Sequence, residues 1–330
     1  MILHPPIIAL VFGSLMIGLM VLYASFFGVQ ILRKWDLRSG SELQLALERK
    51  TYLVSTILSY AFGFQLFSLF LFVYTADGIS GLFVGAMCAA GALFVNSYGY
   101  PALILKIVNF LFAGCWLIIN HADNRASDYP LVKIKYVVLL ILTPLIVLEA
   151  AVQATYFAGL EPDVITSCCG ALFSKDALAL ASGIGALPLQ PMRIVLPLVL
   201  ALTFGTGLRF FRTGRGPYLF SAASTVAFVT SVAALISVIS PYFYELPTHH
   251  CPFCILQKEY GYVGYVLYVT LLGGAIAGMG VGILAPFRGI QSLAESLPAL
   301  QRRLSILALA LYGLFTVMVL YKIYSANLRL

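Results

Sequence analysis

The amino-acid sequence predicts an all-α, polytopic helical membrane protein with about eight transmembrane helices and both termini outside. Composition is the first observation, because 61% of the 330 residues are hydrophobic and only 10% are charged, whereas soluble domains average about 25% charged residues. The second is a series of apolar stretches, each about as long as a helix that crosses a bilayer. The third is the alternation of basic loops along the chain, which predicts the orientation.

The apolar stretches divide the chain into eight expected spans. The first could be mistaken for a signal peptide, but it lacks a basic N-terminal region and exceeds the usual apolar core of such a peptide. We therefore interpret it as a retained span. The expected spans cover residues 7–31, 52–74, 101–120, 132–158, 193–211, 217–241, 258–285 and 303–325.

Basic residues gather in alternate loops, and this accounts for the net charge of +7 without a nucleic-acid partner. Because cytoplasmic loops of membrane proteins are enriched in Lys and Arg, we expect the odd-numbered loops in the cytoplasm and both termini outside. In a bacterium, the protein would lie in the inner membrane and its outer loops in the periplasm. The four basic loops contain Arg33, Lys34, Arg38, Arg49 and Lys50; Arg125, Lys133 and Lys135; Arg209, Arg212 and Arg215; and Arg288, Arg302 and Arg303.

We expect residues 1–330 to form one membrane domain, so that any soluble partner would be a separate chain. Outer loops at about 75–100, 159–192 and 242–257 carry most of the six cysteines. The first loop is rich in glycine and polar residues, and we expect a short interfacial or re-entrant helix there. Cys115 falls inside a span and is expected to be a packing residue. The periplasm is oxidising, so disulfide chemistry is possible at the outer cysteines.

The third outer loop contains a C-x-x-C motif, Cys251-Pro252-Phe253-Cys254. Proline suits the first turn of a helix, so we expect Cys251 to cap the next span, where the positive end of the helix dipole favours a thiolate. Lys258, one turn after Cys254, would add positive potential. Such a pair is suited to thiol–disulfide exchange, although a structural disulfide, inert thiols or a metal site are alternatives.

The second outer loop contains the adjacent pair Cys168 and Cys169. Neighbouring Cα atoms are about 3.8 Å apart, whereas disulfides usually need about 4.4–6.8 Å. A bond between the two would be strained, so each could instead pair with another outer cysteine, or both could be incidental loop residues. Cys88 lies among small residues, where close helix packing is the first interpretation and a third redox thiol the second.

His249 and His250 precede the C-x-x-C motif directly. With Cys251 and Cys254 they would supply four nitrogen and sulfur ligands for Cu(I) or Zn(II), although neighbouring residues at one helix start rarely all reach one metal. They could equally accept protons during thiol or quinone chemistry, or simply be solvated.

Two further features of the expected spans have a functional and a structural interpretation. Glu149 lies within the fourth span, where an ionisable group indicates either a proton path or a polar contact between helices. Tyr262 and Tyr265 belong to a cluster of tyrosines near the outer interface, which is typical of an aromatic belt. The same two residues could also line a quinone headgroup pocket.

The segment "CPFCILQK" resembles the C-x-x-C-x-x-x-Arg element of the bacterial disulfide-forming quinone reductases (the DsbB family) and, more loosely, the C-x-x-C of vitamin K epoxide reductases. The resemblance covers about ten residues and the topology. It implies that Cys251 and Cys254 begin a helix beside a bound quinone and that Lys258 takes the place of the quinone-contacting Arg. It also implies that Cys168 and Cys169 relay electrons from a soluble thioredoxin-fold partner.

This sequence departs from that family in three ways: it has about eight spans instead of four, its loop cysteines are adjacent, and Lys cannot make the forked hydrogen bonds of Arg. Our hypothesis is a membrane thiol–disulfide oxidoreductase that links a periplasmic dithiol to ubiquinone or menaquinone. The alternatives are a membrane protein that handles Cu or Zn, and a membrane subunit of an electron-transfer or assembly complex whose cysteines form structural disulfides.

Overall fold

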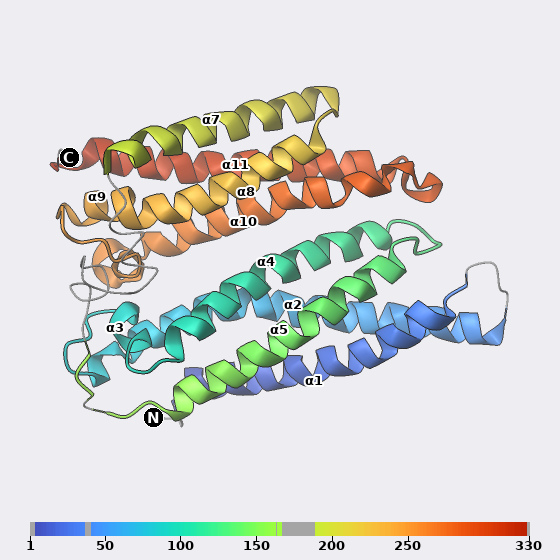
Figure 1. Ribbon diagram of the computed structural model, residues 1–330, viewed down its shortest axis with the longest axis horizontal. Coiled ribbons are helices and arrows are strands. Elements are labelled where there is room, and N and C mark those ends of the chain that lie inside the picture. The colour runs from blue at the N-terminus through green and yellow to red at the C-terminus, as the bar shows by residue number, and fades with distance from the viewer. Residues whose placement is uncertain (1–3, 37–40, 163, 167–188, 329–330) are drawn as a thin grey trace. The chain divides into compact units, whose positions relative to one another are not determined.

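The structure, a computed structural model, describes residues 4–36, 41–162, 164–166 and 189–328. In this part of the chain, eight helices are long and apolar enough to cross a membrane, which confirms the predicted all-α fold and number of spans and indicates a multi-pass membrane protein. Figure 1 shows these helices. They are α1 (Pro5–Lys34), α2 (Glu42–Gly78), α4 (Gly99–Asp123), α5 (Val132–Ala158), α7 (Leu189–Thr213), α8 (Pro217–Ala234), α10 (Val263–Ile283) and α11 (Ser296–Ser325).

The main difference in helix bounds is at α2, which has 37 residues and begins ten positions before the expected span 52–74. Its first part, Glu42–Thr51, contains Leu, Gln, Ala, Glu, Arg and Lys, all of which are strong helix formers. Hydropathy reports only the apolar part of a helix, so the polar extension is not visible to it. α2 therefore begins before its apolar stretch does.

Contacts divide the chain into two compact units of four long helices each. The first unit holds α1, most of α2, α4 and α5. The second holds α7, α8, α10, α11 and the segment that follows α2. By residue number, the first unit is Met1–Thr75, Asn96–Glu161 and Phe287–Leu297, and the second is Ala76–Val95, Pro162–Pro286 and Pro298–Leu330.

Aromatic packing fills the centre of the first unit. α5 packs against both α1 and α4. The rings of Phe62 and Trp116 meet edge to face at 4.8 Å between centroids, and the Trp116 indole donates to the main-chain oxygen of Lys135 at 2.9 Å. Gly28 lies so close to the Tyr136 ring that a Cβ would stand 2.8 Å from it. α1 and α5 can therefore approach closely only with glycine at this position.

A buried ion pair joins α4 and α5 within the first unit. Lys106 Nζ lies 2.8 Å from Glu149 Oε1, and both side chains are almost fully buried. Asn109 and Gln65 donate to the other carboxylate oxygen, and Ser68 accepts from Lys106 at 3.2 Å. Glu149 thus makes a polar contact between three helices. The proton-path interpretation of Glu149 stays a prediction.

A second buried ion pair lies where α4 passes into α5. Lys135 Nζ is 2.7 Å from Asp123 Oδ2, and both side chains are fully buried. The other Asp123 oxygen accepts from the main-chain N–H of Leu131 at 2.8 Å, and Lys135 also donates to Asn120 at 3.2 Å. Because an unpaired charge is very costly in an apolar interior, these contacts hold the α4–α5 connection in one arrangement.

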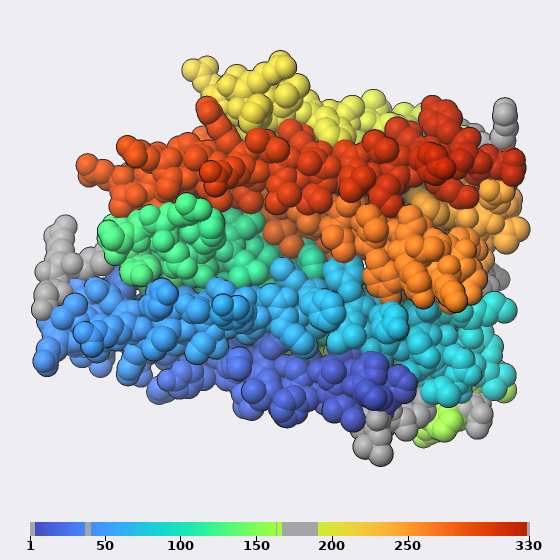
Figure 2. Space-filling view, turned by 180° about the vertical axis from the view of Figure 1, so that it is seen from behind, coloured from blue at the N-terminus to red at the C-terminus, as the bar shows by residue number. Residues whose placement is uncertain are grey.

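Glycine allows close helix packing in the second unit as well, as the spacing of Gly274, Gly278 and Gly282 along α10 indicates. α10 packs against α8. A Cβ at Gly278 or Gly282 would collide with a serine of α8, and one at Gly274 would meet the ring of Tyr312 of α11 at 3.2 Å. On the face seen in Figure 2, the side chains of α11 (red) form a continuous ridge.

The last turns of α8 widen before the chain reaches the C-x-x-C motif. Residues Leu235–Ile239 form a π-helix and Ser240–Tyr244 form the short helix α9. Pro241 has no N–H to donate to the preceding turn, and a local π turn is one way in which a membrane helix accommodates a proline. α9 ends at Glu245, whose φ of 56° is left-handed. The chain therefore turns away from the helix axis here.

The expectation that Cys251 caps a long helix is wrong. Two short 3₁₀ turns, Cys254–Leu256 and Lys258–Tyr260, follow the motif, and α10 begins only at Val263. Gly261 and Tyr262 between them have φ values of 62° and 57°. A left-handed pair cannot continue a right-handed helix, so the dipole of α10 does not act on Cys251.

The loop at 75–100 contains a short helix, as predicted. This helix, α3 (Ala89–Leu93), is buried, and Cys88 precedes it as the N-cap residue. An isolated parallel bridge pairs Val84 with Ile165. The hydroxyl of Thr166 donates to the main-chain oxygen of Gly91 at 3.1 Å. Residues 165–166 therefore lie beside α3 and the segment that precedes it.

The Lys106–Glu149 pair gives a test of the first unit. Glu149→Gln leaves the Lys106 charge buried without its partner, and we expect the free energy of unfolding to fall by about 3–5 kcal/mol. The double variant Lys106→Met/Glu149→Gln has no buried charge at this place and should be more stable than Glu149→Gln alone. Unfolding in mixed detergent micelles measures both.

Lys322→Gln is the matched control, because it breaks a partly exposed ion pair with Glu245 at 3.4 Å. Such a pair contributes about 1 kcal/mol or less. If Glu149→Gln lowered the free energy of unfolding no more than this control does, the buried pair would not contribute substantially to the stability of the first unit.

Candidate functional site

Three cysteine sulfur atoms converge in the second unit. The Sγ atoms of Cys88, Cys251 and Cys254 all lie within 4.8 Å of one another, and those of Cys88 and Cys251 are 3.6 Å apart. This distance is far above the disulfide bond length of about 2.05 Å, so this pair is in contact without a covalent bond. The residues are buried, with exposed fractions of 0%, 0% and 6%. Among the described residues, these three cysteines form a group with the spacing of metal ligands.

Asp77 at the end of α2 holds Cys88 against the C-x-x-C loop. Its Oδ1 accepts from the main-chain N–H of Ala89 and from the Gln257 side chain, both at 3.1 Å. Gln257 also donates to the main-chain oxygen of Met87 at 2.8 Å. One carboxylate oxygen and one amide therefore connect the residues on both sides of Cys88 to the turn that follows Cys254.

Two tyrosine hydroxyls hold the main chain of the C-x-x-C loop. The Tyr244 hydroxyl donates to the main-chain oxygen of Cys251 and accepts from the N–H of Ile255 at 3.0 Å. The Tyr268 hydroxyl of α10 donates to the main-chain oxygen of Pro252. Buried main-chain groups outside regular helices need such partners. The two side chains thus take the place of the helix that the sequence predicted here.

Gly264 in the first turn of α10 lies directly against this loop. A Cβ at this position would stand 2.8 Å from the main-chain oxygen of Ile255 and 2.9 Å from its carbonyl carbon. The neighbour is backbone, which cannot rotate away as a side chain can. Glycine is therefore required for α10 to reach the C-x-x-C loop so closely.

His249 and His250 are half-buried, and each has a partner away from the sulfurs. The His249 ring lies on Tyr244 with 4.1 Å between centroids, and His250 Nδ1 is 3.0 Å from the main-chain oxygen of Ile236 in the π-helix. Burial lowers the pKa of His249, His250 lowers it further, and Cys88 acts in the opposite direction. Neither histidine belongs to the group of sulfurs with metal-ligand spacing, which instead includes Cys88.

The remaining residues predicted to surround a quinone do not converge on one point. Lys258 is exposed on the second 3₁₀ turn. Tyr262 is 48% exposed, and its ring is 6.4 Å from that of Tyr265. Tyr260 lies closer to the site: its ring meets Tyr244 at 5.1 Å, and burial, with contributions from Cys254 and Glu259, raises its pKa.

The predicted relay pair, Cys168 and Cys169, lies outside the described residues. The chain leads toward it from Thr166, which is hydrogen-bonded to α3. Glu149 lies in the first unit with Lys106. Cys115 lies within α4 in the same unit and is buried, as expected of a packing residue.

The three-sulfur arrangement is compatible with two kinds of chemistry. Sulfurs in contact can exchange a disulfide bond, because a thiolate must reach a disulfide sulfur along a short path. Three thiolates within 4.8 Å of one another could also hold a soft ion such as Cu(I) or Zn(II). The packing interpretation of Cys88, which the sequence favoured, is compatible with this contact as well, because two buried sulfur atoms 3.6 Å apart are in van der Waals contact.

Sequence reasoning missed Asp77, Gln257, Tyr244 and Tyr268 as parts of the site. Asp77 and Gln257 are 180 positions apart, so no local sequence pattern predicts their contact. Tyr244 and Tyr268 belong to a sequence region rich in tyrosine, and nothing along the chain distinguishes them from the other tyrosines there. A polar residue in the loop at 75–100, such as Asp77 three positions after the expected span, was the one signal that could have prompted a search.

Comparisons with known proteins add no assignment. No family model, no curated protein and no solved structure matches the chain.

The Tyr244 hydroxyl gives a test of the site geometry. Tyr244→Phe removes the partner of two buried main-chain groups, which costs about 1–3 kcal/mol. We expect the loop to open more often, so that Cys251 and Cys254 of the reduced protein react with iodoacetamide about tenfold faster under native conditions. Mass spectrometry of the labelled peptide measures the rate.

Tyr262→Phe is the control for this variant, because the Tyr262 side chain is half exposed in the same loop region. It should leave the labelling rate unchanged. Equal rates in wild type and Tyr244→Phe would show that the hydroxyl does not hold the loop.

The depressed pKa of His249 predicts a pH effect on stability. The unfolded chain takes up a proton near pH 6.5, whereas the folded protein takes it up only at lower pH. The unfolded state therefore binds more protons below about pH 6.5, and acidification destabilises the fold. Between pH 7.5 and about pH 5, we expect the melting temperature of His249→Asn to fall less than that of the wild type.

The quantity to compare is the change of melting temperature with pH, because His249→Asn also removes the ring contact with Tyr244 at every pH. His4→Asn, at an exposed histidine before α1, is the control and should follow the wild type. A wild-type pH dependence in His249→Asn would contradict the prediction.

Proposed function

We propose that this protein is a membrane thiol–disulfide oxidoreductase that works through Cys251, Cys254 and Cys88. The observation that carries the proposal is the convergence of the three buried sulfurs within 4.8 Å. The C-x-x-C spacing supports it, because such pairs form and break disulfides readily. The hydrogen bonds of Tyr244 and Tyr268 to the main chain of the C-x-x-C loop also support the proposal. They fix the positions of the sulfurs, so that disulfide exchange between them is fast relative to exchange with bulk thiols.

The proposed cycle begins with a Cys251–Cys254 disulfide. One thiolate of an external dithiol attacks a sulfur of this bond, a mixed disulfide forms, and the electron pair of the broken bond passes to the other cysteine. The second donor thiolate then attacks the mixed disulfide and releases the donor as a disulfide. The donor is oxidised by two electrons, and Cys251 and Cys254 are reduced to thiols.

Cys88 would take part by exchange within the cluster. Its sulfur is 3.6 Å from that of Cys251, so a Cys88 thiolate can attack Cys251 in the disulfide form. The Cys88–Cys251 bond forms, the Cys251–Cys254 bond breaks, and Cys254 leaves as the thiolate. No net oxidation occurs in this step. Cys168 and Cys169 remain the proposed relay between the external dithiol and this cluster.

A membrane quinone is the proposed electron acceptor, since reoxidation of the two thiols needs a two-electron oxidant. His249 and His250 would be its polar contacts because they are half-buried beside the cluster. Lys258 and Tyr262 are exposed and, with Tyr265, would contact only a headgroup at the outer edge of the loop. When bound, the quinone would accept two electrons and two protons.

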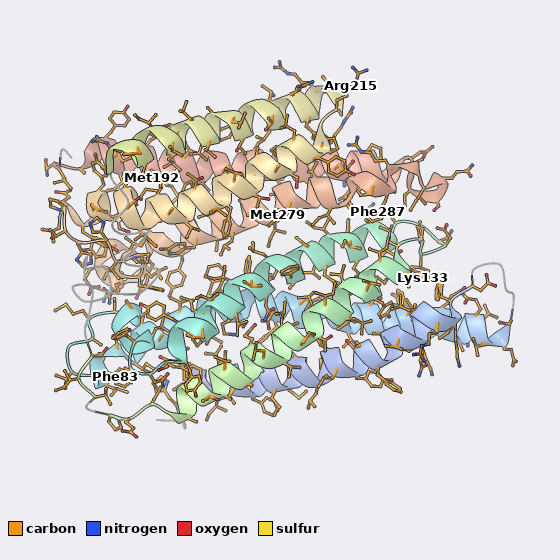
Figure 3. The ribbon with its side chains drawn as sticks, in the orientation of Figure 1. Phe83, Lys133, Met192, Arg215, Met279 and Phe287 are labelled. Carbon is orange, nitrogen blue, oxygen red and sulfur yellow. The ribbon has the colours of Figure 1, made fainter. Side chains whose placement is uncertain are left out.

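We also propose on which side of the membrane the reaction takes place. The alternation of basic loops favours an orientation with both termini outside, in the inner membrane of a bacterium. Arg215 belongs to one of the basic loops. In the second unit it lies at one end of the helices, and Met192 lies at the other end (Figure 3). The cysteine cluster would then face the periplasm, where a soluble thioredoxin-fold protein is the proposed dithiol partner. Further membrane subunits remain part of the proposal.

Soft-metal binding is the second candidate function. It is favoured by the same three sulfurs, whose mutual distances suit thiolates around one Cu(I) or Zn(II) ion. The ligand set would be Cys88, Cys251 and Cys254, instead of the His249, His250, Cys251 and Cys254 set that the sequence suggested. The third alternative, a structural disulfide in a subunit of a larger complex, predicts a bond that never opens.

Thiol trapping of the purified protein tests the proposal. We expect the Cys251–Cys254 disulfide to open with dithiothreitol and to re-form on addition of a soluble ubiquinone analogue, with no metal present. Cys254→Ser should accumulate a Cys88–Cys251 disulfide, because Cys251 then has one near partner. Cys251→Ser should abolish dithiol oxidation without affecting membrane insertion. Peptide mapping by mass spectrometry gives the pairing, and elemental analysis gives the metal content.

Cys115→Ser is the control, because this residue lies in the other unit, and it should behave as wild type. Normal turnover in Cys251→Ser would exclude the oxidoreductase. Reduced cysteines with one equivalent of copper or zinc would establish the metal function instead, and an inert disulfide would establish the structural one.

A further inference from the structure

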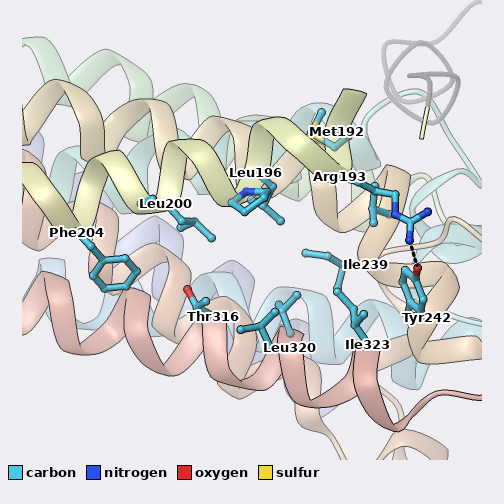
Figure 4. Close-up of a pocket in the computed structure, with 14 residues that line it drawn as sticks. Met192, Arg193, Leu196, Leu200, Phe204, Ile239, Tyr242, Thr316, Leu320 and Ile323 are labelled. Carbon is cyan, nitrogen blue, oxygen red and sulfur yellow. Dashed lines mark hydrogen bonds between the residues drawn. The ribbon is translucent and has the colours of Figure 1, made fainter. Parts of the chain in front are cut away.

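A groove runs between α7, α11, the π-helix and α9 in the second unit (Figure 4). Its volume is about 420 Å³, within the range of small-molecule sites. The wall on α7 repeats every three or four residues, so one face of the helix lines the groove along its length. The residues that line it are Met192, Arg193, Leu196, Pro197, Leu200, Ala201, Phe204, Val238, Ile239, Tyr242, Thr316, Val319, Leu320 and Ile323.

The groove has a polar end and an apolar end. Arg193 and Tyr242 lie at one end, where the guanidinium donates to the Tyr242 hydroxyl at 3.2 Å, and Phe204 lies toward the other (Figure 4). Apart from these two residues and the Thr316 hydroxyl, the lining carries hydrocarbon or thioether side chains. Arginine keeps its charge at any physiological pH. The lining therefore matches a molecule with an anionic head and a long hydrocarbon tail.

We propose that this groove binds one acyl chain of an anionic amphiphile, with the carboxylate or phosphate at Arg193 and the chain along Leu196, Leu200 and Phe204. Charge complementarity selects the head, because guanidinium pairs strongly with carboxylate and phosphate oxygens. The apolar walls select the tail, because each buried methylene is favourable. A free fatty acid and a membrane phospholipid share this chemistry.

The groove also borders the element that holds the cysteine loop. Ile239 of the π-helix and Tyr242 of α9 line the groove, while Ile236 and Tyr244 of the same two turns contact His250 and Cys251. The acyl chain would therefore rest on one side of a short helix whose other residues hold the C-x-x-C loop. The binding proposal itself does not depend on the oxidoreductase.

Photolabelling of the full-length protein in detergent tests the proposal. The probe is a palmitate analogue with a diazirine near the end of its chain, and mass spectrometry of the digested protein locates the label. We expect labelled peptides from α7 and α11 that contain groove residues. Palmitate should compete with the probe about tenfold more strongly than hexadecanol, which lacks the charge. Arg193→Gln should remove this difference, and Ala201→Trp, which fills the groove, should abolish the label.

Two matched variants on α7 separate these effects from loss of folding. Arg209→Gln removes an arginine outside the groove and should keep the preference for palmitate. Leu202→Trp places the same side chain next to Ala201, on an exposed position that does not line the groove, and it should label as wild type. Equal competition by hexadecanol, or full labelling of Ala201→Trp, would overturn the proposal. A phospholipid that displaces the probe at a lower concentration than palmitate does would identify a membrane lipid as the source of the chain.

Discussion

The hydrogen-bonding requirement of the main chain governs this structure. In a bilayer every N–H and C=O must find a partner within the protein, and the eight long helices satisfy this requirement by themselves. The C-x-x-C loop cannot, because it interrupts the helices with two 3₁₀ turns and a left-handed pair. Side chains replace the missing partners. Tyr244 and Tyr268 donate hydrogen bonds to main-chain oxygens of the C-x-x-C loop. Gln257 donates to the main-chain oxygen of Met87 and to the carboxylate of Asp77.

The two units solve the problem of buried polar groups differently. The first unit buries charges, and each is paired: Lys106 with Glu149 and Lys135 with Asp123. Paired charges in an apolar interior tolerate few alternative arrangements, because breaking one pair leaves a costly ion behind. The second unit relies on glycine contacts along α10 and on hydroxyl hydrogen bonds around the cysteines.

One short segment connects the features that carry the two proposals. The π-helix and α9 place Tyr242 in the groove beside Arg193 and place Tyr244 under the cysteine loop. π turns interrupt regular helices and frequently occur at functional sites. Here Pro241 accounts for the interruption, and the interruption re-aims residues that would otherwise follow the straight face of α8. The local defect in the helix is therefore what brings groove and cysteine loop onto one element.

The sequence by itself determined the all-α class, the eight apolar helices and the short helix in the loop at 75–100. These follow from composition and from short-range spacing, which depend on neighbours along the chain. It predicted a helix start at Cys251, which is wrong, because the left-handed pair at Gly261 and Tyr262 has no hydropathy signal. It also favoured packing for Cys88. Only the tertiary structure brought Cys88 to Cys251 across 163 positions and Asp77 to Gln257 across 180. Such long-range contacts are decided by how whole helices pack, and no local pattern encodes them.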